Sequence, residues 1–256
     1  MPTPVPPHRS VARSAGEWIF RRRGYLPLAL GGVLAWVVHH DPLPSGSPGC
    51  LPGWRLAGGA LGTAGILLRG WVLGTVPPGT SGRTTRFFRA ASLNTTAAYS
   101  LVRHPLYLAN GLLWVGASAF TASTAVISAT AVAWWAYHRI ILVAEEAFLE
   151  ERFGDAFQVW KRRTPRLFPR PGSWVPSSQE FRFGAALDRD HPAFMALLTT
   201  ITVLESVREH ALSGALLPDV PWRVGFVAGL ALYLAVTVRR RLTREPASAP
   251  PTPPGR

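Results

Sequence analysis

The sequence has a single cysteine and few charged residues. Cys50 alone cannot form an intrachain disulfide, and no Cys/His pattern with zinc-site spacing exists. Charged residues make up 16% of the chain, whereas soluble domains usually carry about 25%. Because 48% of the residues are hydrophobic and gather in long runs, these scarcities indicate a membrane protein and exclude a disulfide-rich secreted domain.

The N-terminus lacks the pattern of a cleaved signal peptide. Prolines and arginines precede the first apolar run, and no short apolar core ends in a small-residue cleavage site. The C-terminal end is also rich in proline and low in complexity. We expect both ends to be disordered.

Six apolar stretches run through the chain. They lack the alternation that marks strands, and a helix needs about 20 apolar residues to cross a bilayer. We therefore expect an all-α polytopic membrane protein with about six transmembrane helices. The stretches cover residues 24–38, 54–76, 106–120, 122–144, 193–217 and 221–238. The second, fourth and sixth are the most convincing spans, the first and third are short, and charged residues interrupt the fifth.

This order divides the chain into six parts. They are a disordered basic N-terminus (1–23), a first helix pair (24–76), a core (77–170), a cytoplasmic loop (171–192), a second helix pair (193–238) and a basic Pro-rich tail (239–256). Small residues four apart, Gly58 with Gly62 and Gly225 with Gly229, predict close helix packing in lipid.

The positive charges follow the expected topology. With a cytoplasmic N-terminus and six spans, roughly 23 of the 27 Lys and Arg residues fall on the cytoplasmic side. We therefore predict an inner-membrane protein with both termini in the cytoplasm. Topology and anionic lipid account for the net charge of +13, so we expect no nucleic-acid partner.

A cationic pattern stands where the third apolar stretch begins. Arg103-His104-Pro105 enters this stretch, and proline favours the first turn of a helix. A helix start offers free backbone donors and a partial positive charge, to which Arg103 adds a full charge. Such a place suits a carboxylate or phosphate, and Tyr107 can stack on a purine.

Two adjacent glutamates, Glu145 and Glu146, end the fourth apolar stretch on the same side of the membrane. Because a tight turn joins the third and fourth stretches, both sites lie at one depth. The two sites together suit the carboxylate, amine and ribose of S-adenosylmethionine. Each pattern alone could instead be a positively charged helix start or a solvated helix end.

The combined motif resembles a known superfamily. Arg-His-Pro-x-Tyr, then Glu-Glu-x-x-Leu-x-x-x-Phe-Gly, an aromatic residue and Pro-x-x-x-Pro are similar to the isoprenylcysteine carboxyl methyltransferases and phospholipid methyltransferases. The resemblance covers about residues 80–170 and implies a catalytic core there, with S-adenosylmethionine bound at the cytoplasmic face. The cofactor residues that it implies are Tyr99, Arg103, His104, Pro105, Tyr107, Glu145 and Glu146.

Further elements are similar to a bacterial branch that includes methyltransferases acting on the 1-phosphate of lipid A. They are Thr80-Ser81-Gly82-Arg83, Leu93-Asn94-Thr95-Thr96 and Asn110. This likeness implies that Arg83 and Asn110 contact the acceptor. Ala97 and Ala109 stand where the superfamily usually has glycine, and because alanine resists positive φ we expect either an altered cofactor fit or a weakened relative of the superfamily.

Charged residues within the fifth stretch invite a functional interpretation. Glu205, Arg208 and Glu209 lie at helical spacing, and charges inside a span are costly. Glu205 and Arg208 could contact the acceptor's head group, or these charges could pair with one another and with Arg69. His39-His40-Asp41 has no third ligand segment, so we expect no metal.

We expect O-methylation of an anionic phosphate or carboxylate on a membrane lipid or prenylated acceptor. Such an acceptor needs alignment rather than a base, with Arg83, Arg103 or Arg139 holding the anion; an amine acceptor would need Glu145 or His104 as a base. Arg103, Glu145 and Arg139 are the predicted catalytic residues. One alternative is a membrane reductase using NADPH, since sterol-type reductases share a similar Arg-His-Pro-x-Tyr region. Another is a non-catalytic binding or transport protein.

Overall fold

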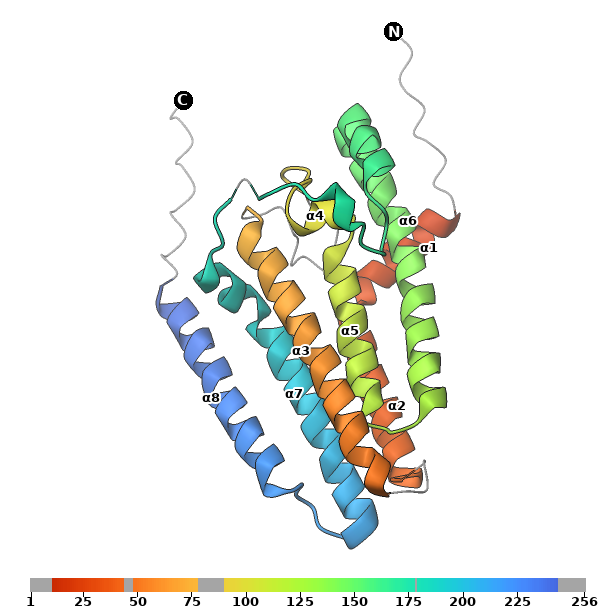
Figure 1. The fold of residues 1–256 in the computed structure, drawn as a ribbon, viewed down its shortest axis with the longest axis vertical. Coiled ribbons are helices and arrows are strands. Elements are labelled where there is room, and N and C mark those ends of the chain that lie inside the picture. The colour runs from red at the N-terminus through yellow and green to blue at the C-terminus, as the bar shows by residue number, and fades with distance from the viewer. Residues whose placement is uncertain (1–10, 44–47, 78–89, 178, 244–256) are drawn as a thin grey trace, which may run out of the picture.

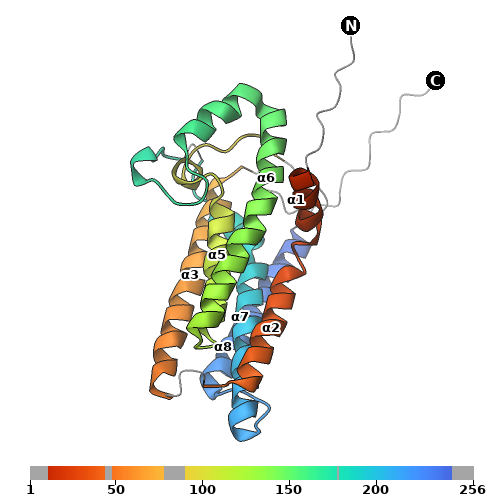
Figure 2. The same cartoon turned by 90° about the vertical axis from the view of Figure 1, so that its right-hand side faces the viewer.

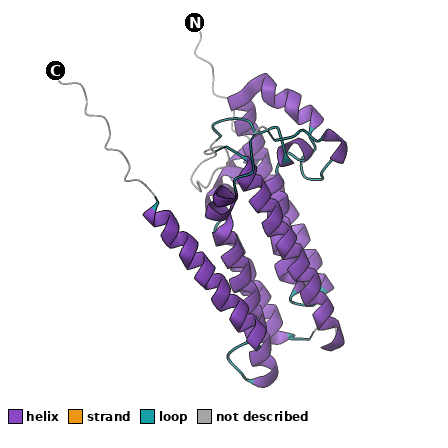
Figure 3. Ribbon diagram, turned by 60° about the vertical axis from the view of Figure 1, so that its left-hand side comes forward, coloured by secondary structure: helices purple, strands orange, loops and turns teal. Residues whose placement is uncertain are grey.

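The computed structural model describes residues 11–43, 48–77, 90–177 and 179–243. Within these ranges the regular elements are all helical (Figures 1 and 3). They are α1 (Val11–Arg22), α2 (Leu26–His40), η1 (Pro48–Cys50), α3 (Leu51–Thr75), α4 (Ala98–Leu101), α5 (Pro105–Ala119), α6 (Thr124–Arg163), η2 (Pro171–Ser173), α7 (Phe183–Ser213) and α8 (Val220–Leu242). Each of the six apolar stretches lies in a helix of its own, so the all-α prediction is confirmed.

Three helices in the described ranges are both long enough and apolar enough to cross a membrane. They are α3, α6 and α8, the helices of the three most convincing stretches. Helix α2 is apolar but shorter, and α5 has only 15 residues. The other three of the six expected crossings stay predictions.

The long helices form one bundle (Figures 1 and 2). The end of α2, the start of α3 and the connections α5–α6 and α7–α8 lie at one end of it, while α1 and α4 lie at the other end (Figure 1). We call the second end the loop end, because segments 90–97 and 164–182 also lie there. Helix α3 packs against α5 and α7, and α2 and α8 also contact α7.

Glycines allow α3 and α5 to approach closely. An ideal Cβ built at Gly116 would lie 2.8 Å from the backbone nitrogen of Gly62 and 2.9 Å from the carbonyl oxygen of Gly58. The predicted close packing at Gly58 and Gly62 is therefore confirmed. Gly229 also packs tightly, against a leucine of α7, whereas Gly225 has no neighbour within 4 Å of its Cβ position, so that part of the prediction is wrong.

The prediction of a disordered N-terminus is wrong for residues 11–22. They form α1, which packs on α6. A Cβ at Gly16 would lie 2.6 Å from the carbonyl oxygen of Ile140, and Phe20 is buried. An apolar face, one small residue and an ion pair between Arg13 and Glu151 of α6 thus dock this short basic helix on the bundle.

The boundaries of two other helices differ from those expected. Glu145 and Glu146 do not end α6, which continues to Arg163 through a bend at Gly154 with φ 50° and ψ −125°. The arm beyond the bend turns across the loop end (Figure 2). Helix α7 begins at Phe183, so the predicted loop 171–192 is half helical.

Candidate active site

A large cavity of about 620 Å³ lies inside the bundle. Its walls come from α1, α2, α3, α5, α6 and α7, together with residues 90–99. This volume falls within the range of about 300–1,000 Å³ typical of small-molecule sites. The structure therefore has room for a ligand of nucleoside size or larger.

Six of the predicted site residues line this cavity. They are Tyr99, Arg103, His104, Tyr107, Asn110 and Glu145. Pro105 is buried at the first position of α5, so it starts the helix as predicted and does not line the cavity. The bend at Gly154 brings Trp160 over the loop end, where it lines the cavity and its Nε1 donates a 3.0 Å hydrogen bond to the carbonyl oxygen of Tyr99.

Glu145 presents an unsatisfied acceptor. Its side chain lines the cavity, and its buried Oε2 has no hydrogen-bond partner among the described residues. A buried oxygen without a donor carries a free-energy penalty of about 1–3 kcal/mol. Glu145 is therefore suited to a ligand that brings its own N–H or O–H donor.

Tyr99 lies near this carboxylate. Burial, and after it the charge of Glu145, raises the pKa of the Tyr99 phenol above its ordinary value. The hydroxyl therefore stays protonated at neutral pH and can donate a hydrogen bond.

Burial lowers the pKa of Arg103, while the Glu146 carboxylate opposes that shift. An arginine in this position remains a cation.

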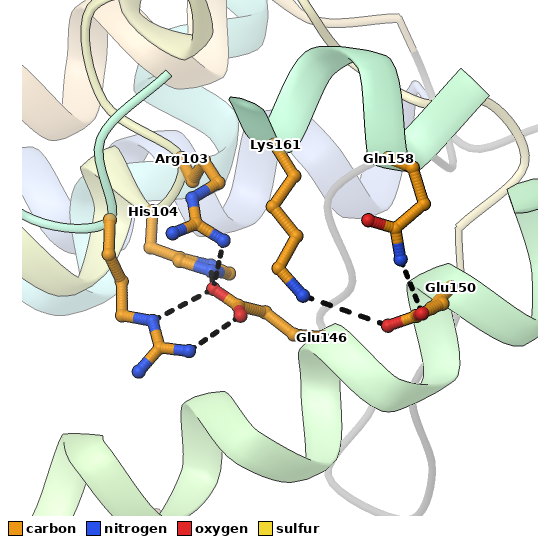
Figure 4. A network of polar contacts seen from close by, with 7 residues as sticks. Arg103, His104, Glu146, Glu150, Gln158 and Lys161 are labelled. Atoms are coloured by element: carbon orange, nitrogen blue, oxygen red, sulfur yellow. Dashed lines mark hydrogen bonds and ion pairs between the residues drawn. The ribbon is translucent and has the colours of Figure 1, made fainter. Parts of the chain in front are cut away.

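Glu146 is the centre of a buried ionic network (Figure 4). Its Oε1 accepts hydrogen bonds from Arg103 Nη1 at 2.8 Å, His104 Nε2 at 3.2 Å and Arg166 Nε at 3.0 Å, and its Oε2 accepts one from Arg166 Nη2 at 2.7 Å. Since a carboxylate only accepts, His104 Nε2 carries a proton. Glu146 does not line the cavity, so the structure does not bring it to a cofactor; it holds Arg103 and His104 in place.

Arg166 was not among the site residues predicted from the sequence. The only signal was its position within the Pro-x-x-x-Pro element, directly after Pro165. The backbone reinforces this contact, because Arg103 N donates to the carbonyl oxygen of Pro165 at 2.8 Å and Arg170 N donates to that of Leu101 at 3.0 Å. The segment after α6 therefore fixes the start of α5.

The two alanines at glycine positions of the superfamily lie outside the cavity wall. Ala97 has φ 51° and ψ −131°, a conformation that favours glycine. Ala109 is fully buried, and its carbonyl oxygen lies 3.0 Å from a Cβ built at Gly65 in α3. Ala97 thus bears backbone strain and Ala109 fills the α3–α5 contact. The altered cofactor fit stays a prediction.

Arg139 does not line the cavity, so the structure does not bring it together with the other predicted site residues, and its catalytic role stays a prediction. Its side chain is exposed on α6, with the guanidinium 5.2 Å from the ring centroid of Trp135. Six residues upstream of Glu145 correspond to about 240° around a helix with 3.6 residues per turn. Arg139 and Glu145 therefore face different directions.

Glu205 and Arg208 also lie outside the cavity, so the structure does not bring them to a head group there. Glu205 pairs with Arg55 and lies 3.7 Å from Arg208 Nε. Arg208 donates to the carbonyl oxygens of Pro42 and Phe120. This network links α3, α7, Pro42 after α2 and Phe120 after α5, at the end of the bundle opposite the loop end. Arg83 lies outside the described residues.

Three arginines that the sequence reading did not place at the site also line the cavity: Arg23, Arg69 and Arg189. One interpretation of the sequence expected Arg69 to pair with the charges near residue 205, but the structure does not show this pairing. Its Nε donates to Asp190 Oδ1 at 2.7 Å and its Nη1 donates to Asn110 Oδ1 at 2.5 Å. Hydropathy alone gave no indication of these partners.

Residues 54–156 match the phospholipid methyltransferase family. This family is part of the isoprenylcysteine carboxyl methyltransferase-like superfamily, so the resemblance inferred from the motifs is confirmed. The match runs from α3 through the bend in α6 and contains Tyr99, Arg103 and Glu145. It supports a membrane methyltransferase, while α2, α7 and α8 lie outside it.

Two curated relatives are similar to part of the chain. The cobalt-zinc-cadmium resistance protein CzcN of Cupriavidus metallidurans is 40% identical over 79 residues, which are 31% of this chain and 36% of the relative. The nickel-cobalt-cadmium resistance protein NccN of Alcaligenes xylosoxydans xylosoxydans is 35% identical over 82 residues, which are 32% of this chain and 38% of the relative. The chain thus spans little more than a third of these relatives.

No solved structure matches the chain. In the described part of the chain, no group of three or more His, Cys, Asp or Glu side chains is placed to hold a metal ion.

Proposed function

We propose that this protein transfers the methyl group of S-adenosylmethionine to an anionic head group on a membrane lipid or prenylated acceptor. One observation carries the proposal. The part of the cavity wall that matches the family contains both Glu145, whose Oε2 has no partner, and Arg103, which Glu146 holds in place. An anion-binding group and an acceptor for N–H or O–H donors thus share one polar wall.

The residues present fit this cofactor. Glu145 would accept hydrogen bonds from the amine or the ribose hydroxyls. Arg103 has a buried Nε with no partner among the described residues, so it could still donate to the carboxylate while Glu146 holds its Nη1. Tyr99 would donate a hydrogen bond from a hydroxyl that stays protonated, and Tyr107 would pack against the adenine.

The bound cofactor would supply an electrophilic methyl carbon on a sulfonium. The acceptor oxygen would form the new O–CH₃ bond as the S–CH₃ bond breaks, and the electrons of that bond would stay on sulfur, so S-adenosylhomocysteine would be the second product. An anionic oxygen needs no general base, so the contribution of the protein is alignment. The Glu146 network fixes Arg103, and Trp160 on the bent arm of α6 would help to exclude water.

The charge distribution supports a cytoplasmic loop end. Arg21 and Arg22 end α1 and Arg23 follows them at this end, and Arg239, Arg240 and Arg241 lie in the last turn of α8 there. Positively charged flanks remain on the cytoplasmic side of a membrane protein. We infer that both termini face the cytoplasm and that the cofactor enters from there, while the acceptor enters from the inner membrane.

Calorimetric titration of the purified full chain with S-adenosylhomocysteine tests the proposal. Binding should weaken by about tenfold or more in Glu145→Gln, because a hydrogen bond to a charged group contributes about 1.5–3 kcal/mol. Glu150→Gln is the matched control, since Glu150 lies on the same helix, is exposed and does not line the cavity.

NADPH provides the second arm of the titration. Binding of NADPH in place of S-adenosylhomocysteine would overturn the proposal in favour of a reductase. Binding of neither ligand would favour a non-catalytic protein. Equal S-adenosylhomocysteine affinity in the wild type and Glu145→Gln would refute the assignment of the site.

A further inference from the structure

A second polar cluster lies deeper in the same cavity. Arg69 of α3 is the centre of this cluster, with Asn110 of α5 and Asp190 of α7 as its partners at 2.5 and 2.7 Å. Arg69 lies six residues from the loop-end terminus of α3, or about 9 Å into the bundle at 1.5 Å per residue. The cluster therefore lies below the loops, within the packed helices.

The partners of Arg69 fix its guanidinium without using all of its donors. Nε and Nη1 are bound, while Nη2 has no hydrogen-bond partner among the described residues. Arg69 lines the cavity with a side chain that is 17% exposed, and the Asp190 side chain is 7% exposed. A buried charge that is held in one orientation is expensive to maintain, which makes a binding role the default hypothesis for it.

The charge of the cavity favours an anion. The described lining residues include four arginines, Arg23, Arg69, Arg103 and Arg189, and a single carboxylate, Glu145. Asp190 and Glu146 pair with Arg69 and Arg103 from outside the wall, and the four arginines still outnumber the three carboxylates. Arg189 lies at a similar depth to Arg69, six residues from the loop-end start of α7. Its Nη1 donates to the carbonyl oxygen of Leu73 in α3 at 3.1 Å. Two cations, one from α3 and one from α7, thus line the same cavity.

The cavity continues beyond these arginines into an apolar region. Its walls there come from α2, α5 and α7 and include Leu30, Leu34, Leu113, Ala117, Ala196 and Leu197. Ala117 lies 12 residues into α5, or about 18 Å from the start of that helix. A hydrocarbon chain fits this part of the cavity, and a polar cofactor does not.

We propose that Arg69 and Arg189 bind the phosphate or carboxylate of an anionic amphiphile whose hydrocarbon chain lies between α2, α5 and α7. Asp190 and Asn110 are positioning residues that orient Arg69. Helices α2 and α7 lie outside the family match, so this subsite belongs to the flanking helices of this chain as much as to the core. Its role as the methyl-acceptor site rests on the function proposed above.

Binding of dodecyl phosphate to the full chain in nonionic detergent, with saturating S-adenosylhomocysteine, tests this subsite. Dodecanol, dodecanoate and inorganic phosphate are the comparison probes. We expect dodecyl phosphate or dodecanoate to bind at least about tenfold more tightly than dodecanol, since a charge-assisted hydrogen bond contributes about 1.5–3 kcal/mol. Inorganic phosphate should bind more weakly than dodecyl phosphate, because it lacks the chain.

The double variant Arg69→Gln/Asp190→Asn tests the proposed anion contact. It removes both charges, so neither is left buried without its partner. We expect at least about a tenfold loss of dodecyl phosphate affinity with S-adenosylhomocysteine affinity unchanged, which shows that the variant is folded. Arg139→Gln is the matched control, because Arg139 is an exposed arginine on a bundle helix, and it should bind both ligands as the wild type does.

The variant Ala196→Trp tests the chain-binding region. It should weaken binding of dodecyl phosphate and leave that of butyl phosphate unchanged. Equal affinity for dodecanol and dodecyl phosphate, or full dodecyl phosphate affinity in the double variant, would overturn the proposed subsite. The two proposals fail separately: S-adenosylhomocysteine binding without alkyl phosphate binding refutes only the subsite, and the reverse result refutes only the methyltransferase assignment.

Discussion

Two positions in the chain share one unusual backbone conformation but carry different residues. Ala97 has φ 51° and ψ −131°, and Gly154 has φ 50° and ψ −125°. A non-glycine residue in such a region costs about 1–3 kcal/mol. Reciprocal substitutions, Ala97→Gly and Gly154→Ala, should therefore change the free energy of unfolding in opposite directions.

The expected magnitudes differ because the surroundings differ. A Cβ at Gly154 has no neighbour within 4 Å, so Gly154→Ala introduces the backbone strain and recovers only about 0.4–1 kcal/mol from the less flexible unfolded chain. We expect a net destabilisation of about 1–2 kcal/mol. Ala97→Gly relieves the same strain, but it removes a buried methyl group worth about 0.8 kcal/mol and makes the unfolded chain more flexible. Its net stabilisation should be about 0.5 kcal/mol.

Thermal unfolding of both variants in one detergent measures these effects. For a chain of this size, 1 kcal/mol corresponds to about 2–4 °C, so Gly154→Ala should lower the midpoint by several degrees and Ala97→Gly should raise it slightly. The reasoning is refuted if Ala97→Gly lowers the midpoint as much as Gly154→Ala does, because strain would then not distinguish the two positions.

Three further substitutions test the packing and the ionic networks. Glu146→Gln should destabilise the protein by about 3–5 kcal/mol and weaken S-adenosylhomocysteine binding, because it leaves Arg103 and Arg166 without their shared carboxylate. Thermal unfolding measures the first effect and calorimetric titration the second. An unchanged unfolding midpoint would contradict the network. Arg208→Gln should destabilise by about 1–3 kcal/mol, because the carbonyl oxygens of Pro42 and Phe120 lose their donors while Arg55 still holds Glu205. Its S-adenosylhomocysteine affinity should equal that of the wild type, and a loss of affinity would show that the two ends of the bundle are coupled. Gly116→Ala should destabilise by about 1–3 kcal/mol through overpacking against α3, whereas the control Gly59→Ala, which meets no atom within 4 Å, should stabilise by up to about 1 kcal/mol.

The parts of the site that depend on local sequence could be predicted. Pro105 starts α5, a short connection joins α5 to α6, and Arg103 and Glu145 therefore lie near one end of the bundle. Hydropathy likewise predicted all six long helices, and its three most convincing stretches lie in the three helices that are both long enough and apolar enough to cross a membrane. These features follow from helix starts, spacing and run length, which a single sequence contains.

The parts that depend on helix rotation could not be predicted. Whether Arg69 faces Asp190 or Glu205 is decided by how α3 and α7 pack, and hydropathy does not report that packing. Arg166 reaches Glu146 because the bend at Gly154 turns the chain across the loop end, a long-range consequence of one residue. The misplacement of Arg139 is different in kind, since helical periodicity alone separates it from Glu145.

The division of the cavity wall between matched and flanking helices bears on how the acceptor is chosen. Tyr99, Arg103 and Glu145 come from the segment that matches the phospholipid methyltransferase family, whereas Leu34 and Arg189 come from α2 and α7 outside it. Exchanging the residues that α2 and α7 contribute would leave the proposed cofactor wall intact, because Glu146 holds Arg103 through contacts made within residues 103–166. The same exchange would change both the charge and the width of the deeper region. The two proposals together therefore place cofactor binding in the matched core and the segment that follows it to Arg166, and acceptor selection at the junction of that core with α2 and α7.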